Sequence, residues 1–447
     1  MTRVTTSAPD PTRPAGSPDE QARAAAEDLG AFVAASPSSF HAAAQVRDRL
    51  VARGFSELDE AAPWPSSPGG YVVVRDGGVI AWVVPTGAGP TTPFTVLGAH
   101  TDSPGFVLKP RPTTGRDGWV QAGVEVYGGP LLNSWLDREL VLAGRLVTRD
   151  GASHLTRTEP LLRIPQLAIH LDRAVNDGLT LDRQQHTQPV WSLGDPSRAD
   201  LLAVLAGAAG IDPADVAGYD VVTTDAQHPA VFGAGGTLLA SGRLDNLASV
   251  HAGLRALEEI GPEGLGGDAP IAVLAAFDHE EIGSETRSGA AGPFLADVLS
   301  RVGAGLGASP EEHHRAFAGS LCVSADCGHG VHPNYPERHD PANRPRLGSG
   351  VLLKINANQR YATDGVGAAA WHRICADAAA DVQEFVSNNV LPCGSTIGPI
   401  TATRLGIRTV DVGLPLLSMH SARELAAVED VAALARAARS ALSGAWR

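Results

Sequence analysis

The sequence predicts an α/β protein that is interrupted by a β-rich insertion. From Leu244 to the C-terminus, short apolar runs alternate with segments of helical periodicity, the pattern of a sheet covered by helices. Between residues 106 and 232 the chain instead has short apolar runs, many glycines and prolines, and few long helical periods. We therefore expect one domain formed by 21–105 and 233–447, with a β-rich domain at 106–232 inserted into it.

Length and composition are those of a globular protein. The 447 residues are enough for two or three domains, or for one large domain with an insertion. The hydrophobic content is 43%, and no apolar run is long enough for a transmembrane helix. A formal net charge of −14 argues against nucleic acid or an anionic membrane as the main partner.

The N-terminus and the cysteines indicate the compartment. Residues 1–20 are rich in proline, serine and threonine and lack the apolar core of a secretion signal, so we expect a disordered leader. The four cysteines form no CxxC pair and no dense framework, which is typical of reduced, mostly buried thiols in a cytosolic enzyme. Both features predict a cytoplasmic protein.

The N-terminal part begins with two helices and a hairpin. Helical periodicity predicts helices at 21–35 and 39–53, the second with Ser39 as its N-cap. The apolar runs 71–74 and 79–84 flank the turn sequence Arg-Asp-Gly-Gly and predict a β-hairpin.

The rest of the chain is expected to form further strands and helices. A strand ends at His100, and the insertion holds strands at 141–147 and 161–164 and a short helix at 200–207. The outer domain then continues with a helix at 247–260, a strand at 271–277, a helix at 293–302, strands at 320–325 and 351–356, a helix at 366–388, a strand at 409–413 and a helix at 422–442.

An acidic cluster, Asp-His-Glu-Glu at 278–281, follows the apolar run 271–277. Adjacent carboxylates at a strand end repel one another unless a cation or another partner offsets the repulsion. Neighbouring residues that leave a strand point in different directions, so one of Glu280 and Glu281 is suited to bind a metal and the other to handle a proton. The alternative is a solvated acidic turn.

Four further apolar segments lead to residues of the same kind. His100 and Asp102 follow one of them, Asp326 follows another, and His420 lies on the loop after 409–413. Asp245 follows a short segment where a helix begins. Open α/β sheets place their sites at the carboxyl ends of strands, so we expect these residues to meet in a metal site.

The ligand types narrow the chemistry. Histidines and carboxylates without thiolates suit zinc, manganese or cobalt. Two histidines and three carboxylates exceed what one catalytic zinc needs, but they suit two ions about 3.5–4 Å apart. Asp245 suits a bridging role, and Asp102 is placed to accept the other ring N–H of His100. The residues alone therefore indicate metal-dependent hydrolysis of an amide or ester, without choosing the substrate.

Eight sequence blocks carry further information: LGAHTDSPGF, RIPQLAIHLDR, SGRLDNL, FDHEEIGSE, SADCGHGVHPNY, KINANQRYAT, PCGSTIGPITATRLGI and PLLSMHSARELA. Together they resemble the aspartyl aminopeptidase family of cocatalytic zinc peptidases, and the similarity runs in the same order from about Phe40 to the C-terminus. The resemblance implies a three-layer α/β/α peptidase domain with an inserted β-rich domain that builds dimers and, in many members, a dodecamer.

The same resemblance implies two zinc ions per subunit, replaceable by manganese or cobalt. It assigns roles to residues of this chain as follows: His100, Asp245 and Asp326 hold one ion, Asp245, Glu281 and His420 hold the other, Glu280 is the general base, and Asp102 orients His100. The implied substrates are peptides with a free N-terminus, preferably Asp or Glu.

Two further residues are candidates for substrate binding. Lys354 lies in the apolar run 352–356, where a buried ammonium needs an anionic partner. That partner would be the substrate's side-chain carboxylate or, alternatively, an internal Asp or Glu. His170 resembles a family histidine that reaches a neighbouring subunit's active site, and the alternative is a satisfied histidine within the insertion.

Other possibilities remain open at this stage. His329 and His332 flank the Asp326 loop and either line the pocket or stabilise the loop, and His279 is assigned no role. Rival functions are a dizinc aminopeptidase that prefers neutral residues, a deacylase, or a non-catalytic assembly protein whose shell carries cargo. The complete set of ligand-type residues argues against the last.

Overall fold

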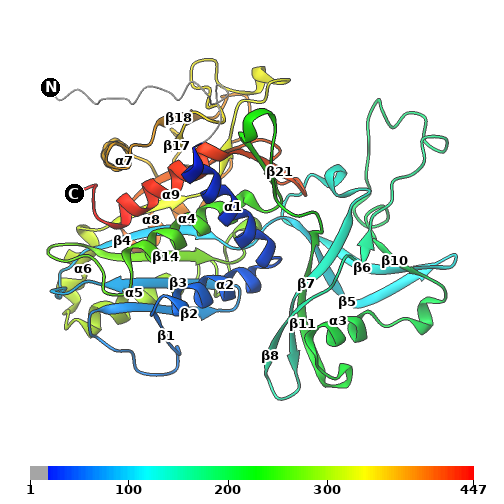
Figure 1. The fold of residues 1–447 in the computed structure, drawn as a ribbon, viewed down its shortest axis with the longest axis horizontal. Helices are drawn as coiled ribbons and strands as arrows, with labels where there is room; N and C mark the ends of the chain where they lie inside the picture. Colours follow the sequence, from blue (N-terminus) through cyan, green and yellow to red (C-terminus); the bar gives the residue numbers. More distant parts are fainter. Residues whose placement is uncertain (1–18) are drawn as a thin grey trace.

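The structure, a computed structural model, describes residues 19–447, and it has two lobes (Figure 1). The leader expected at 1–20 lies outside the described residues except for its last two positions. Asp19 is the N-cap of the first helix, which begins at Glu20. No helix in the described part of the chain is long and apolar enough to cross a membrane.

The larger lobe is built on a mixed sheet that has nine strands within the described residues. At its centre, β14, β4, β15 and β19 are parallel neighbours, so their carboxyl ends lie along one edge. In spatial order the strands are β1 (Ser56–Glu57), β2 (Gly69–Arg75), β3 (Gly78–Val84), β14 (Ile271–Phe277), β4 (Phe94–His100), β15 (Leu321–Ala325), β19 (Arg408–Gly413), β17 (Val351–Ile355) and β18 (Val382–Val386).

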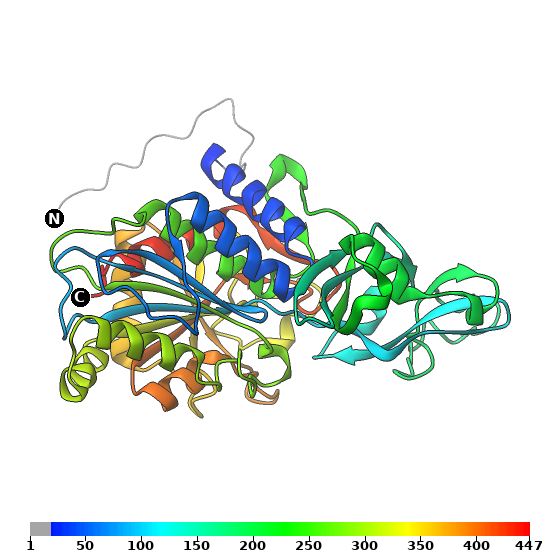
Figure 2. The same ribbon diagram turned by 90° about the horizontal axis from the view of Figure 1, so that it is seen from below.

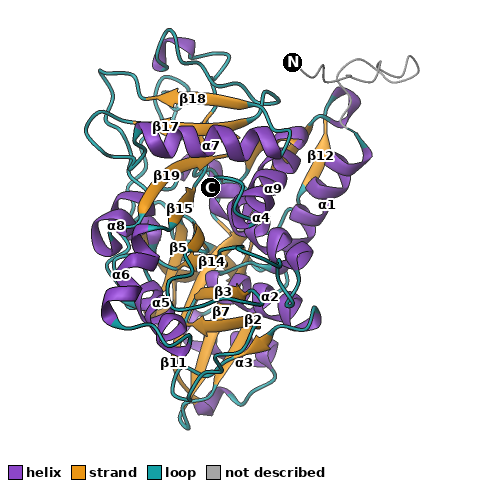
Figure 3. Cartoon of the chain, turned by 90° about the vertical axis from the view of Figure 1, so that its left-hand side faces the viewer, coloured by secondary structure: helices purple, strands orange, loops and turns teal. Residues whose placement is uncertain are grey.

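Helices cover both faces of this sheet (Figures 2 and 3). One face packs against α1 (Glu20–Ala35), α2 (Ser39–Ala52), α4 (Leu244–Ile260), α7 (Gly365–Asp377) and α9 (Val428–Leu442). The other packs against α5 (Phe294–Gly305), α6 (Pro310–Ala318) and α8 (Ile397–Leu405). Strand alternation divides β14 between the two cores, since Leu274 joins the first core and Val273 the second. The predicted three-layer α/β/α architecture is confirmed.

The smaller lobe is a β-rich sheet with its own core. In spatial order its strands are β11 (Val216–Asp225), β5 (Gly105–Arg116), β6 (Trp119–Tyr127), β10 (Val190–Leu193), β9 (Leu162–Arg163), β7 (Glu139–Thr148) and β8 (Ser153–Arg157). Strand β11 also pairs with β7, which closes the sheet on itself. Phe106, Trp135 and Leu205 of α3 (Leu201–Ala209) lie in its core.

The junction between the lobes bears on the domain limits. The strands of the closed sheet lie between residues 105 and 225, whereas β12 (Ala230–Phe232) pairs with β13 (Leu238–Ser241), which pairs with β21 (Glu424–Ala427). We propose the division at 106–232, in which β12, the last strand of the inserted range, pairs with a strand of the outer domain.

Two predicted helices are wrong in part. The helix expected at 366–388 ends at Asp377, because residues 382–386 form β18, which pairs in parallel with β17. The helix expected at 422–442 begins only at Val428, because the residues before it form β21 on β13. In both cases strand pairing with a distant segment overrides local helical periodicity.

Smaller corrections concern helix starts. Ser38, rather than Ser39, caps α2, since the Ser38 Oγ accepts the His41 N–H at 3.4 Å. Helices α6 and α8 were not predicted. A signal for α6 was present, because Ser309 and Glu312 form a capping box around Pro310.

Candidate metal centre and active site

The carboxyl ends of the central parallel strands bring the predicted site residues together. His100 is the last residue of β4, and Asp326 directly follows β15. Glu280 and Glu281 follow β14 within one turn, in the 3-10 helix η5 (Glu280–Ile282). Asp245 stands at the start of α4, where its φ and ψ of −80° and 104° are not helical. The crossover connections between parallel strands explain how segments far apart in sequence meet here.

Two groups of side chains share Asp245. The His100 Nε2 lies 3.3 Å from the Asp245 Oδ1 and 3.7 Å from the Asp326 Oδ1. The His420 Nε2 lies 3.6 Å from the Asp245 Oδ2 and 3.5 Å from the Glu281 Oε1. The two carboxylate oxygens of Asp245 therefore face two different histidines.

Several of these atoms are buried without a hydrogen-bond partner. They are the His100 Nε2, the Asp245 Oδ1 and the Glu281 Oε1, and the three residues offer ligand atoms within 4.8 Å of one another. A buried polar atom without a partner is costly, and three that converge on one point are satisfied together by a cation. The donor set, imidazole nitrogen and carboxylate oxygen, suits zinc.

The electrostatics of the cluster point the same way. Burial and the charge of Asp245 raise the pKa of Glu281 well above its ordinary value, and burial raises the pKa of Glu280 to about 7. Burial alone would lower the pKa of His420, but Asp245 and Glu281 raise it to about 10. Carboxylates crowded so closely repel one another, and a divalent cation among them would offset the repulsion.

Asp102 contacts the ring of His100 and the backbone of Glu280 and Glu281. The His100 Nδ1 lies 3.1 Å from the Asp102 backbone oxygen and 3.4 Å from its Oδ1. The carboxylate also accepts the backbone N–H groups of Glu280 and Glu281, at 3.0 and 3.1 Å. Asp102 is thus placed to orient the His100 ring, chiefly through its backbone carbonyl.

Comparison with known proteins identifies the family of this chain. A family model described as Aminopeptidase I zinc metalloprotease (M18) matches residues 32–440. This chain belongs to the M18 aminopeptidase family. The family seen as a resemblance in the sequence is confirmed, and the chain is an aminopeptidase of this zinc metalloprotease family.

Individual relatives match this chain over nearly its whole length. "Probable M18 family aminopeptidase 2" of Streptomyces avermitilis is 54% identical over 424 residues, covering 94% of this chain and 97% of the relative. The protein of that name from Mycobacterium tuberculosis is 43% identical over 430 residues, covering 94% and 98%.

Solved structures of the family superpose closely. The chain resembles one in a cryo-EM structure of an Ape4 and Nbr1 complex, with a TM-score of 0.89 and 34% identity over 94% of this chain and 86% of that chain. It also resembles a chain of the S. cerevisiae mApe1 dodecamer, with a TM-score of 0.82 and 26% identity over 94% and 97%.

A buried glutamate that was not predicted from the sequence, Glu424, contacts the backbone of two candidate ligands, His420 and Asp245. The Glu424 Oε1 accepts the His420 backbone N–H at 2.8 Å, and its Oε2 accepts the Asp245 backbone N–H at 3.0 Å. Burial, together with the charge of Asp245, raises the pKa of Glu424 to about 8. A signal existed in the sequence, since an acid four residues after His420 stands among apolar neighbours in SARELAAV.

His279 has a backbone function in the site. It adopts a left-handed conformation with φ 63°, which turns the chain so that Glu280 and Glu281 enter the site. Its ring does not reach the candidate ligands: the Nδ1 lies 3.1 Å from the Thr286 Oγ1 and the Nε2 lies 3.8 Å from Asp278. His420 has a similar conformation, with φ 65°. Such conformations cost energy in residues other than glycine and often occur at functional sites.

Lys354 lies on β17 next to the centre and is almost fully buried, at 1% exposed. Its Nζ donates to the Cys327 backbone oxygen at 2.6 Å and lies 4.0 Å from the Asp326 Oδ2. The Nζ also lies 5.4 Å from the centre of the Tyr361 ring. The sequence left two partners open for Lys354, a substrate carboxylate or an internal acid. In the structure the Lys354 ammonium is paired with an internal acid, Asp326, at the longest distance that still counts as an ion pair.

The remaining predicted residues lie outside the ligand cluster. His170 is exposed on the long loop between β9 and β10, and within the described residues no hydrogen bond or ion pair joins it to the cluster. His329 and His332 line a cavity of about 290 Å³, together with Phe385 and Leu417.

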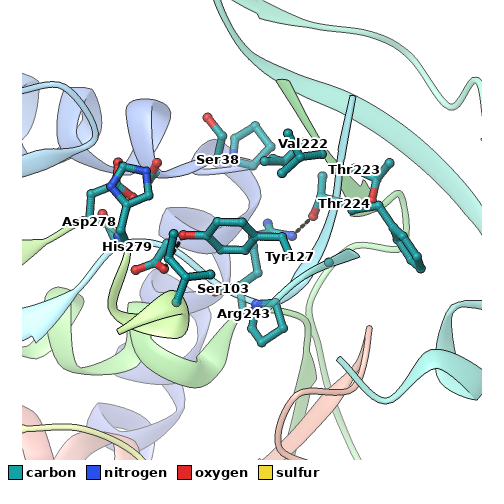
Figure 4. Close-up of a pocket in the computed structure, with 18 of the residues that line it drawn as sticks. Ser38, Ser103, Tyr127, Val222, Thr223, Thr224, Arg243, Asp278 and His279 are labelled. Atoms are coloured by element: carbon teal, nitrogen blue, oxygen red, sulfur yellow. Dashed lines mark hydrogen bonds and ion pairs between the residues drawn. The ribbon is translucent and has the colours of Figure 1, made fainter. Parts of the chain in front are cut away.

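A second cavity, of about 340 Å³, lies between the two lobes beside the metal centre (Figure 4). Its wall includes Asp102 and Asp245 from the outer domain, and Tyr127 and Thr223 from the inserted sheet. The inserted sheet therefore comes within contact distance of the residues that carry the chemistry.

Proposed function

We propose that the chain binds two zinc ions that share Asp245 and removes an N-terminal Asp or Glu from peptides. The observation that carries the proposal is the position of the Asp245 carboxylate, whose Oδ1 faces His100 and whose Oδ2 faces His420. A carboxylate shared by two ions must present its two oxygens to two sets of ligands. Asp326 would complete the first set and Glu281 the second. Manganese or cobalt would occupy the same ligands.

Glu280 is proposed as the general base. When bound, the zinc ions would polarise the scissile carbonyl and lower the pKa of the attacking water. The Glu280 side chain is 17% exposed and that of Glu281 is 5% exposed, so an incoming peptide reaches Glu280 first. Glu280 would take a proton from the water and pass it to the leaving amine. Asp102 would hold the ring of His100 in place meanwhile.

Selectivity for acidic residues is proposed to come from Lys354. The chain contains only two lysines, Lys109 and Lys354, although it has 35 basic residues. One of the two is buried beside the candidate ligand Asp326. The Lys354 ammonium has three N–H donors and only one hydrogen bond within the described residues, to the Cys327 carbonyl. Two donors remain for a substrate carboxylate, in a chain whose net charge is −14.

A substrate panel tests this function directly. We expect the zinc-loaded enzyme to hydrolyse peptides with N-terminal Asp or Glu faster than those with Asn or Leu, and to leave N-acetylated peptides intact. A preference for Leu would replace the proposal with a neutral aminopeptidase, and cleavage of the N-acyl group would replace it with a deacylase. Hydrolysis of no substrate at full zinc loading would favour an assembly protein.

Homo-oligomerisation through the inserted domain is also proposed, with a dodecamer as the expected form. Three large apolar side chains flank His170 and are exposed on the β9–β10 loop, namely Leu167, Ile169 and Leu171. An exposed apolar group of this kind favours burial against another chain. The S. cerevisiae mApe1 structure of similar fold is a dodecamer.

The proposal that His170 completes a neighbour's site is tested by mixing inactive variants. We expect His170→Phe and Glu280→Gln subunits to recover part of the activity when they are co-assembled. An absence of rescue in confirmed mixed oligomers would contradict a shared site.

We also propose that the enzyme works in the cytoplasm, in keeping with its four free thiols, of which Cys322, Cys327 and Cys375 are buried.

A further inference from the structure

One segment of the inserted domain, residues 127–134, runs along the metal centre. It begins at Tyr127, the last residue of β6, and ends in the 3-10 helix η1 (Leu132–Trp135). We call it the bracing segment. It contacts the centre at three places: the first contact acts on Asp102, the second on Glu281 and His420, and the third on the backbone around His420.

The first contact is a side-chain hydrogen bond. The Tyr127 hydroxyl donates to the Asp102 Oδ2 at 2.8 Å. In Figure 4 the Tyr127 ring reaches across the cavity, with its hydroxyl toward the side that carries Asp278 and His279. Burial and the nearby charge of Asp102 raise the pKa of Tyr127, so the hydroxyl keeps the proton that it donates. Asp102 therefore receives a donor from the inserted sheet as well as those from Glu280 and Glu281.

The second contact is made by two glycines. Gly128 has φ +66°, and a Cβ placed on it would lie 3.2 Å from the Glu281 Cβ. The Gly129 carbonyl oxygen accepts the His420 Nδ1–H at 3.0 Å. This bond fixes the ring proton of His420 on Nδ1 and leaves the Nε2 free to face Asp245.

The third contact fixes the backbone of the His420 loop. The Leu131 N–H donates to the His420 carbonyl at 2.9 Å, and the Ala422 N–H donates to the Ser134 Oγ at 2.9 Å. His420 itself is held at φ 65°. Such a conformation persists where the surrounding structure holds it, and the bracing segment supplies contacts of this kind in addition to the one from Glu424.

We propose that the bracing segment is an integral part of the zinc site and that Tyr127 is a positioning residue for His100. The inference rests on the two-zinc site proposed above. The insertion then has a function within a single subunit: its docking on the outer domain sets the orientation of both metal-facing histidines. Zinc binding and docking of the insertion are therefore coupled, so each stabilises the other.

The test measures zinc affinity rather than activity alone. Tyr127→Phe keeps the ring and removes the hydroxyl, so Asp102 loses one of its donors. We expect the affinity of the full-length protein for zinc, measured by competition with a chromophoric chelator, to fall about 10–100-fold. An excess of zinc should restore most of kcat, because the substrate contacts are unchanged.

The matched control is Tyr219→Phe. Tyr219 lies in the same inserted sheet and its hydroxyl donates to the Lys109 backbone oxygen at 2.6 Å, away from the candidate ligands. Its loss should leave zinc affinity unchanged. A second pair compares Gly128→Ala with Gly118→Ala. Both glycines have positive φ, but a Cβ on Gly118 meets nothing within 4 Å. Only Gly128→Ala should weaken zinc binding.

The outcomes separate this inference from the proposed function. If the wild type fails to bind two zinc ions per chain, the two-zinc proposal fails whatever the variants do. If the wild type binds two ions and Tyr127→Phe and Gly128→Ala bind them as tightly as their controls, the two-zinc site stands and the bracing inference is overturned.

Discussion

His100 ends a strand in the middle of the sheet, whereas His420 lies on the loop between β20 (Pro415–Leu416) and β21, outside that sheet. The two halves of the proposed metal centre differ accordingly. In the strand-built half, the side chains of His100 and Asp326 are 1% and 10% exposed and follow β4 and β15 directly. In the loop-built half, the His420 side chain is 31% exposed and is held by Glu424 and by the Gly129 carbonyl. One half is positioned by the sheet itself, and the other by contacts between distant segments.

This difference predicts different sensitivities. A ligand at the end of a buried strand keeps its place when one neighbour is lost, because the strand ladder holds its backbone. A ligand on a loop depends on each of its few contacts. We therefore expect the loop-built half to lose its ion first, and the predictions below sharpen or break that comparison.

The largest effect is expected for the glutamate pair. Glu280→Gln keeps the shape of the side chain but removes its basicity, so kcat should fall at least ~10²-fold with both metals still bound. Glu281→Gln should instead reduce metal content, since Glu281 belongs to the loop-built half. Metal content and kcat, measured on both variants, show which glutamate is the base and which is the ligand. Exchanged phenotypes would mean that the two roles are reversed.

A smaller effect is expected at Lys354, which adjoins the strand-built half. Lys354→Met should reduce kcat/KM for substrates with N-terminal Asp or Glu by roughly ten- to a hundred-fold, the loss of one charge-assisted hydrogen bond worth ~1.5–3 kcal/mol. Leu substrates should change little. Lys109→Met, on the inserted sheet, is the control and should behave as the wild type. An equal loss for every substrate would make Lys354 a structural partner of Asp326.

The smallest effect is expected for Glu424→Gln in the loop-built half. Glutamine keeps the size of the side chain, but its amide group can accept only one of the two N–H donors, from His420 and Asp245. The weaker zinc site should lose about tenfold in affinity, and kcat at saturating zinc should stay near the wild-type value. Glu429→Gln, on the exposed face of α9, serves as control. Equal zinc affinity in the two variants would show that Glu424 does not support zinc binding.

The same comparison explains what the sequence could predict. The candidate ligands were recognisable because each follows an apolar run, and parallel strands bring such ends to one edge. The contacts of the loop-built half left little trace, since a backbone carbonyl such as that of Gly129 has no residue type to signal it. Asp102 lies on the loop after β4, whereas Tyr127 ends β6 of the inserted sheet, so spacing along the chain does not connect them.

The fold shows the same limit. The central strands were predicted within a few residues because they are continuous apolar runs buried on both faces. The segments of β18 and β21 are predicted as parts of helices, but they form strands because they pair with β17 and β13, which are remote in sequence.

The central claim, that two ions share Asp245, is tested most directly by titrating metal-free protein with zinc while following bound metal and aminopeptidase activity together. We expect no activity without metal, little after the first equivalent, and saturation at two equivalents per chain. His420→Ala should saturate at one equivalent and remain nearly inactive. Full activity in demonstrably metal-free protein, or saturation of the wild type at one equivalent, would contradict the account.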